Sequence, residues 1–185
     1  MTVSRDGSRA LRRVNAVLAA LLVLLLVYLL VIVVVGSRAV PGTTAAERTV
    51  ATYASVRAAA NDEVDAFLEI DYRRMDPLLA RVLDGATGGF RAQYRANRVN
   101  LKAAAQAAHA VSTGEVKEIG ISKLGGGTAT LYVAADAVVR NRSTGKVKRT
   151  KACPHDGAVC RYYRLKLTME RVGDTWKMAG LDFVS

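Results

Sequence analysis

Residues Arg161 to Val184 read RYYRLKLTMERVGDTWKMAGLDFV, and this stretch decides the fold. Polar and apolar residues alternate in its first half, which puts Tyr163, Leu165 and Leu167 on one face, as is typical of a half-buried strand. The Gly-Asp pair at residues 173–174 predicts a tight turn into a second strand. This part of the chain is therefore predicted to form an antiparallel β-hairpin.

Two earlier segments carry a related pattern. VSTGEVKEIGISKL at residues 111–124 and TATLYVAADAVV at residues 128–139 are rich in β-branched and aromatic residues, with partial alternation. Three glycines at residues 125–127 separate them. We expect about four long antiparallel strands after Val111 and almost no helix in that region.

The residues before Val111 show helical spacing instead. Thr44 and Glu47 have the T-x-x-E spacing of a capping box, and apolar residues then recur at helical intervals to about Ile70. The sequence DYRRMDP interrupts this pattern, and Asp76 is expected to cap a second, short helix with Pro77 at its first position.

A third helix is predicted from Phe90 into the alanine-rich segment LKAAAQAAHA. Three helices followed by long strands favour an α+β domain, with the helices packed on one face of a curved antiparallel sheet.

The segment at residues 14–35, VNAVLAALLVLLLVYLLVIVVV, contains one polar residue, Asn15, and no charge. As a helix it would extend about 33 Å, enough for a hydrocarbon core of roughly 30 Å. A buried core helix would show a polar stripe, and a secretory signal peptide has an apolar region of only about 7–15 residues. We therefore expect an uncleaved, single-pass transmembrane helix.

Charges next to this segment predict its orientation. Asp6 is the one acidic residue before it, against four arginines: Arg5, Arg9, Arg12 and Arg13. The positive-inside rule then predicts a cytoplasmic tail at residues 1–13, a linker at residues 36–43 and an extracytoplasmic domain at residues 44–185 of a cell-membrane protein.

The two cysteines, Cys153 and Cys160, lie in KACPHDGAVCRYYR at residues 151–164. A zinc site would need about four ligands, and these two with His155 are too few. A redox centre of the thioredoxin type would need C-x-x-C spacing. On the extracytoplasmic side thiols oxidise, so a disulfide across the Pro/Gly turn is predicted.

The formal net charge is +11, and six basic residues gather around the cysteines: Lys146, Lys148, Arg149, Lys151, Arg161 and Arg164. Nucleic acid is not the expected partner, because this patch is predicted to face away from the cytoplasm. Anionic lipid head groups or an acidic protein surface fit better, and a plain solvated loop is the simplest interpretation.

The order of these segments resembles the Mce-associated membrane proteins of actinobacteria, where Mce stands for mammalian cell entry. The resemblance rests on DYRRMD after the first helix, TGGFRAQY at the start of the third, and RLKLTMERVGDTWKMAGLDFV near the C-terminus. It implies a cone-like fold of the nuclear-transport-factor-two-like (cystatin-like, SnoaL-like) type. It also implies an accessory or assembly role in an Mce-type lipid or sterol transport complex of the cell envelope, with permease and Mce proteins as partners.

Enzymes with this cone fold carry an acid, a base or a tyrosine at the open end of the cone. Asp71, Tyr72 and Asp76 have the right chemistry, but capping and packing explain them more simply. His109 ends an alanine-rich helix, and Trp176 follows a tight turn and is expected to pack into the sheet. No catalytic, cofactor-binding or metal site is predicted. Alternatives are a structural component of a conjugative or secretion channel, or a small-ligand-binding or enzymatic cone domain.

Overall fold

The computed structural model describes residues 22–31 and 44–184. The chain divides into two compact units, Met1–Arg48 and Thr49–Ser185. Residues 22–31 are helical with exposed side chains. No helix within these described ranges is long and apolar enough to cross a membrane. The rest of the predicted transmembrane helix at 14–35, the tail at 1–13 and the linker at 36–43 lie outside the described residues.

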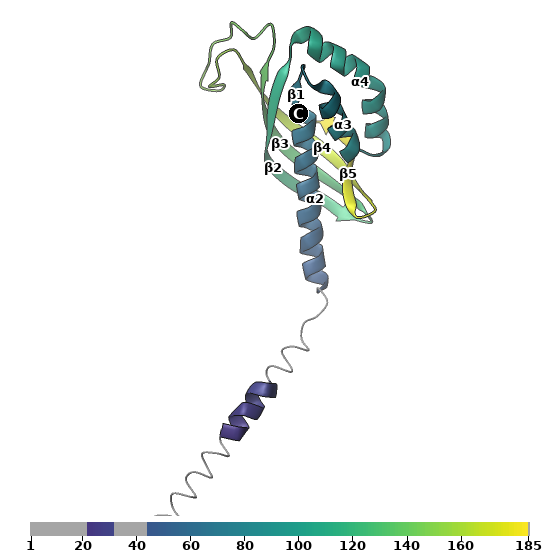
Figure 1. Ribbon diagram of the computed structural model, residues 1–185, viewed down its shortest axis with the longest axis vertical. Coiled ribbons are helices and arrows are strands. Elements are labelled where there is room, and N and C mark those ends of the chain that lie inside the picture. Colours follow the sequence, from purple (N-terminus) through teal and green to yellow (C-terminus); the bar gives the residue numbers. More distant parts are fainter. Residues whose placement is uncertain (1–21, 32–43, 185) are drawn as a thin grey trace, which may run out of the picture. The chain divides into compact units, whose positions relative to one another are not determined.

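Three helices and five strands follow in the order α2, β1, α3, α4, β2, β3, β4, β5 (Figure 1). The helices are α2 (Ala45–Leu68), α3 (Met75–Gly85) and α4 (Gly88–Ala108). The strands are β1 (Ile70–Asp71), β2 (Val111–Gly125), β3 (Thr128–Arg140), β4 (Val159–Val172) and β5 (Thr175–Phe183). The prediction of three helices followed by long strands is confirmed, and residues 111–184 contain no helix.

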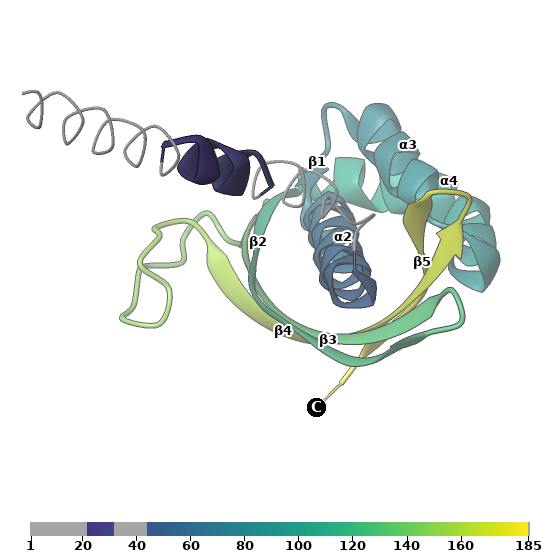
Figure 2. The ribbon, with the colours of Figure 1, turned by 90° about the horizontal axis from the view of Figure 1, so that it is seen from below.

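The strands form one antiparallel sheet in the order β1-β2-β3-β4-β5. Figure 2 shows this sheet curving around α2, with α3 and α4 beside β5. The α+β architecture and the cone-like curvature that the resemblance implied are therefore confirmed. β1, which was not predicted, pairs with Val111 and Ser112, and two register shifts interrupt β2 farther along, at Val116/Glu118 and Ile121/Lys123.

The core lies between α2 and the concave face of the sheet. Val56, Ala60, Val64 and Leu68 recur every four residues along α2 and are buried. They pack against alternate residues of the three central and C-terminal strands: Leu131, Val133, Leu165, Leu167, Met169 and Met178. Trp176 belongs to the same cluster, as predicted. The helix period of 3.6 residues in α2 and the strand period of two residues in the sheet therefore place apolar side chains in one shared layer.

Gly114 explains how closely the end of α2 approaches β2. A Cβ atom at this position would lie 2.4 Å from the Cβ of Leu68, closer than atoms tolerate. The missing side chain lets Leu68 pack directly against β2.

The start of α2 is capped as the sequence predicted. The Glu47 N–H donates to Thr44 Oγ1 at 3.2 Å, and the Thr44 N–H donates to Glu47 Oε2 at 2.6 Å. These reciprocal bonds satisfy two backbone donors that the first helical turn would otherwise leave open.

The predicted cap of α3 is wrong. The helix begins at Met75, its N-cap residue Arg74 makes no side-chain capping bond, and Asp76 lies inside the first turn. Asp71 closes the preceding turn instead, because its carboxylate accepts from the Arg73 N–H at 3.1 Å and its carbonyl from the Arg74 N–H at 2.9 Å. Because the turn from Asp71 to Arg74 is fixed by these bonds, the helix begins at Met75, one residue before Asp76.

Candidate functional site

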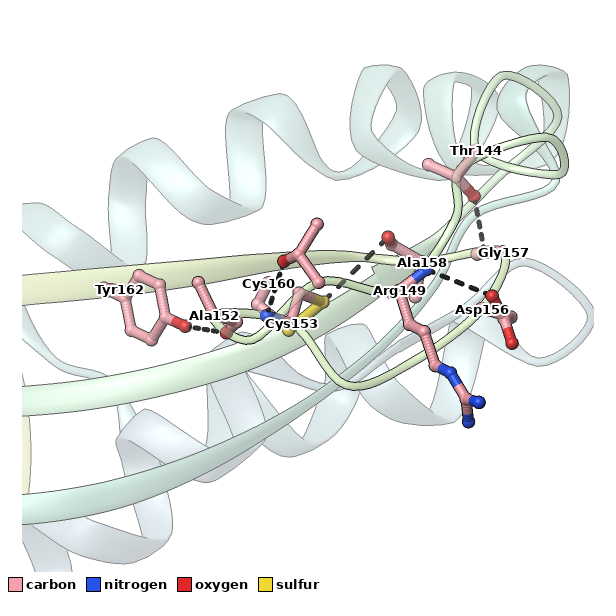
Figure 3. Close-up of a disulfide and its surroundings, with 10 residues drawn as sticks. Thr144, Arg149, Ala152, Cys153, Asp156, Gly157, Ala158, Cys160 and Tyr162 are labelled. Carbon is pink, nitrogen blue, oxygen red and sulfur yellow. Dashed lines mark hydrogen bonds between the residues drawn. A yellow bond between two sulfur atoms is a disulfide. The ribbon is translucent and has the colours of Figure 1, made fainter.

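The segment between β3 and β4, residues 141–158, is called the basic loop below. Its own hydrogen bonds fix its path: Thr144 Oγ1 donates to the Gly157 carbonyl at 2.9 Å, and the Arg149 N–H donates to Asp156 Oδ1 at 3.0 Å (Figure 3). Tyr162 on β4 donates its hydroxyl to the Ala152 carbonyl. The basic loop is therefore tied both to itself and to the sheet.

Cys153 and Cys160 form a disulfide, with their Cα atoms 5.4 Å apart (Figure 3). The bond joins the basic loop to the first residues of β4, where Cys160 lies opposite Val138. The predicted pairing is confirmed. In the part of the chain that the structure describes, no group of three His, Cys, Asp or Glu side chains could hold a metal ion.

The structure separates the six residues of the predicted basic patch. Lys146, Lys148, Arg149 and Lys151 are exposed on the basic loop. Arg161 and Arg164 are three residues apart on β4, so they point to opposite faces of the sheet. Arg161 lies opposite the buried Ala137, on the helix-facing side, and Arg164 lies on the convex side. Binding of lipid or protein by this patch stays a prediction.

The acidic and aromatic residues of DYRRMD have structural partners. Arg73 donates from Nε and Nη2 to the two oxygens of Asp71, each at 2.8 Å, and these bonds lower the pKa of Asp71 to about 2. Asp76 forms an ion pair with Lys102 at 2.6 Å. Asp71 therefore remains ionised and is poorly suited to accept a proton near neutral pH.

Tyr72 stacks on His109 with ring centroids 4.7 Å apart and nearly parallel planes. His109 ends α4 with a left-handed backbone (φ 50°), and Arg142 Nη2 lies 2.7 Å from its Nε2. A guanidinium only donates, so in this contact His109 Nε2 is the acceptor. His109 thus fastens the start of the basic loop to the end of α4.

A cavity of about 350 Å³ lies beside the C-terminal end of α2 and is called the mouth pocket below. Its wall is mostly apolar and comes from eight elements, with six large contributors: Phe67, Met75, Leu78, Tyr94, Leu101 and Phe183. Sequence reasoning missed this pocket. The signal available was the alternation of β4, which puts Arg161 on the same face as Tyr163 and Leu165.

Four groups in the mouth pocket can donate hydrogen bonds: Arg161, Ser112, Tyr94 and Tyr163. Burial raises the pKa of Tyr94, so its phenol stays protonated. Glu69 is the acidic residue of the lining, and it is bound by Arg74 at 2.7 Å and Arg81 at 3.1 Å. The pocket therefore combines apolar walls with donors, and its one carboxylate is already neutralised.

A second unusual group lies away from the pocket. Glu63 on α2 is only 8% exposed, and its Oε2 has no hydrogen-bond partner within the described residues. Burial raises its pKa from 4.5 to about 7, although the positive charges of Arg81 and Lys177 oppose the shift. Gly85 makes room for this side chain, since a Cβ there would lie 1.2 Å from Glu63 Oε1.

Comparison with known proteins identifies the family. The model of the family described as "Uncharacterized protein Rv1363c/MT1408-like" matches residues 14–185. The chain belongs to the Rv1363c/MT1408-like family. A curated relative, "Uncharacterized protein Rv1363c" from Mycobacterium tuberculosis, is 25% identical over 131 residues, which is 71% of this chain and 46% of the relative. The chain thus spans about half the length of that relative. The match to the Rv1363c/MT1408-like family is consistent with the actinobacterial family expected from the sequence. The expected association with Mce proteins stays a prediction.

Two solved structures share the fold of this Rv1363c/MT1408-like protein. An IcmL-like type IV secretion system protein from Legionella pneumophila aligns with a TM-score of 0.54 and 12% identity, over 71% of this chain and 91% of that chain. CagV, a VirB8 homologue of the type IV secretion system of Helicobacter pylori, aligns with a TM-score of 0.53 and 8% identity, over 71% of this chain and 97% of that chain. At these identities the likeness concerns the fold.

Proposed function

We propose that this protein is a non-catalytic, membrane-anchored assembly component of a transport complex in the cell envelope. The observation that carries the proposal is the fold shared with two type IV secretion system proteins, over more than nine-tenths of each of those chains. A secretion or conjugation channel is therefore the first candidate complex.

The anchor is part of the same proposal. Residues 14–35 lack charge, and the helical residues 22–31 among them expose large apolar side chains to their surroundings. Arginines precede this segment, so the positive-inside rule favours a cytoplasmic N-terminus and a domain on the outer side. The Cys153–Cys160 disulfide agrees with an oxidising compartment.

A second candidate is an accessory role in an Mce-type lipid transport complex. Its support is the set of sequence motifs on which the resemblance rests: DYRRMD joins β1 to α3, TGGFRAQY opens α4, and the third motif forms the β4–β5 hairpin. Tethering raises the effective concentration of the domain beside membrane partners, so a modest interface suffices in either complex.

Crosslinking in native membranes tests the proposal. A photoreactive residue replaces Val147 on the basic loop of the full-length protein, and captured partners are identified by mass spectrometry after affinity purification. Recovery of secretion or conjugation channel subunits supports the first candidate. Mce or permease subunits would overturn it in favour of the second, and turnover of a small molecule by the purified full-length protein would overturn both.

A matched control separates tethering from contact. A version that lacks residues 1–42 and is exported by another signal should retain the disulfide and the circular dichroism of the domain but recover less of the complex. Equal recovery would show that the anchor contributes nothing to assembly.

A further inference from the structure

The mouth pocket is divided into an apolar interior and a polar edge. Phe67 packs against Tyr94 with ring centroids 6.5 Å apart, and Tyr163 packs against Phe183 at 5.8 Å. Met75 and Leu78 of α3 are buried in the same wall. Arg161, by contrast, is exposed to solvent while still lining the cavity. A molecule that fills this space must be apolar over most of its length and polar at one end.

Several hydrogen-bond donors in the lining of the mouth pocket have no acceptor among the described residues. The side chains of Arg161, Ser112, Tyr94 and Tyr163 form no hydrogen bond or ion pair with the residues the structure describes. Ser112 is only 4% exposed but lines the cavity, so its hydroxyl can donate to a molecule bound there. Arginine binds a carboxylate through two parallel N–H···O bonds, which is the strongest pairing this donor set offers.

The charge balance of the pocket excludes a cationic ligand. Glu69 would be the one anionic group to receive it, but Arg74 and Arg81 already hold both of its oxygens. The remaining charge in the lining is that of Arg161, which is positive. The size also restricts the ligand, because about 350 Å³ is near the lower limit for small-molecule pockets and accommodates one acyl chain.

We propose that the mouth pocket binds a free single-chain carboxylate, a medium- or long-chain fatty acid. The acyl chain lies against Phe67, Leu78 and Tyr94, and the carboxylate accepts hydrogen bonds from Arg161 at the solvent edge. Ser112 donates a further hydrogen bond from the β2 side. This ligand is independent of the assembly role proposed above.

Photolabelling of the full-length protein in phosphatidylcholine nanodiscs tests the proposal. The probe is dodecanoic acid with a diazirine near the end of its chain, and unlabelled dodecanoate and dodecanol serve as competitors. Labelled peptides should come from residues 67–78 and 94–101, and dodecanoate should compete better than dodecanol. Labelling of residues 14–35 reports the probe dissolved in the bilayer and provides an internal reference.

Two substitutions on β4 form a matched pair, because each removes one positive charge from an exposed arginine. Arg161→Gln should weaken competition by dodecanoate about tenfold, the loss expected for one charge-assisted hydrogen bond, and leave dodecanol unchanged. Arg164→Gln, on the opposite face, should change dodecanoate competition by less than about twofold. Equal effects of the two substitutions would refute the role of Arg161, and labelling confined to peptides outside the pocket would refute the site.

Discussion

Replacing Glu63 by glutamine should stabilise the folded domain above neutral pH and have little effect near pH 4.5. Glu63 is buried against Gly85, and its Oε2 finds no hydrogen-bond donor among the described residues. Burial opposes ionisation of the carboxyl group and raises its pKa from 4.5 to about 7. Glutamine has nearly the same shape and carries no charge, so it removes the cost of burying the carboxylate while preserving the packing.

The sign and size of the effect follow from the two pKa values. Below pH 4.5 both the folded and the unfolded chain hold the proton, and Glu63 contributes its full stability. As the pH rises from 4.5 to about 7, the unfolded chain releases the proton first, so the free energy of unfolding falls. The total loss is at most about 3 kcal/mol, at roughly 1.4 kcal/mol per pKa unit.

Urea unfolding of the full-length protein in a non-ionic detergent, followed by circular dichroism, measures this difference. The gain in stability of Glu63→Gln over the natural protein should grow between pH 5 and pH 8 by about 2–3 kcal/mol. Glu118→Gln, at an exposed position of β2, is the control for replacing a carboxylate that is not buried. A constant difference between Glu63→Gln and the natural protein across this range would refute the argument, because the carboxylate would then be ionised at no cost in the folded state.

Three further predictions concern stability. Replacing Cys153 and Cys160 together by serine should lower the free energy of unfolding by about 2.5 kcal/mol on the chain-entropy model, as measured by urea titration under non-reducing conditions. Gly85→Ala should destabilise the domain by more than about 1 kcal/mol because its Cβ would overlap the buried carboxylate, whereas Gly89→Ala, with open space around it, should be neutral or stabilising in thermal unfolding. Asp71→Asn should remove the part of the stability that the natural protein loses between about pH 4 and pH 2, because the folded pKa of this carboxyl is lowered to about 2; an unchanged acid-unfolding curve would contradict this.

The elements that the sequence predicted well are those with strong local signals. The alternation through Leu165 and Leu167, the capping box at Thr44 and the glycine-separated strands each depend on residues a few positions apart. β1 was not predicted, because a strand of two residues is too short to show a periodic pattern. It forms by pairing with Val111 and Ser112 at the start of β2. Asp76 was assigned as a cap since its residue type fits, while a competing aspartate five residues earlier had already closed the turn.

The candidate sites divide in the same way. The disulfide could be predicted because spacing, a Pro/Gly turn and the expected compartment all pointed to it. The mouth pocket could not, since its wall joins side chains as far apart in sequence as Phe67 and Phe183. The basic patch was predicted in part. Four of its members share one loop, but Arg161 and Arg164 are three positions apart on a strand, and this odd offset predicts that they lie on opposite faces.

The outer edge of β2 has a consequence for how this domain behaves at high concentration. β1 covers only Val111 and Ser112, so the remainder of a fifteen-residue strand presents backbone donors and acceptors on that side within the described structure. Such an edge can recruit a strand from a neighbouring copy and begin aggregation. The two register shifts break its regular spacing, and the exposed Lys117 and Lys123 would be crowded by an added strand. A membrane anchor would confine many copies to one plane, and these irregularities would then keep crowded neighbours from joining sheet to sheet.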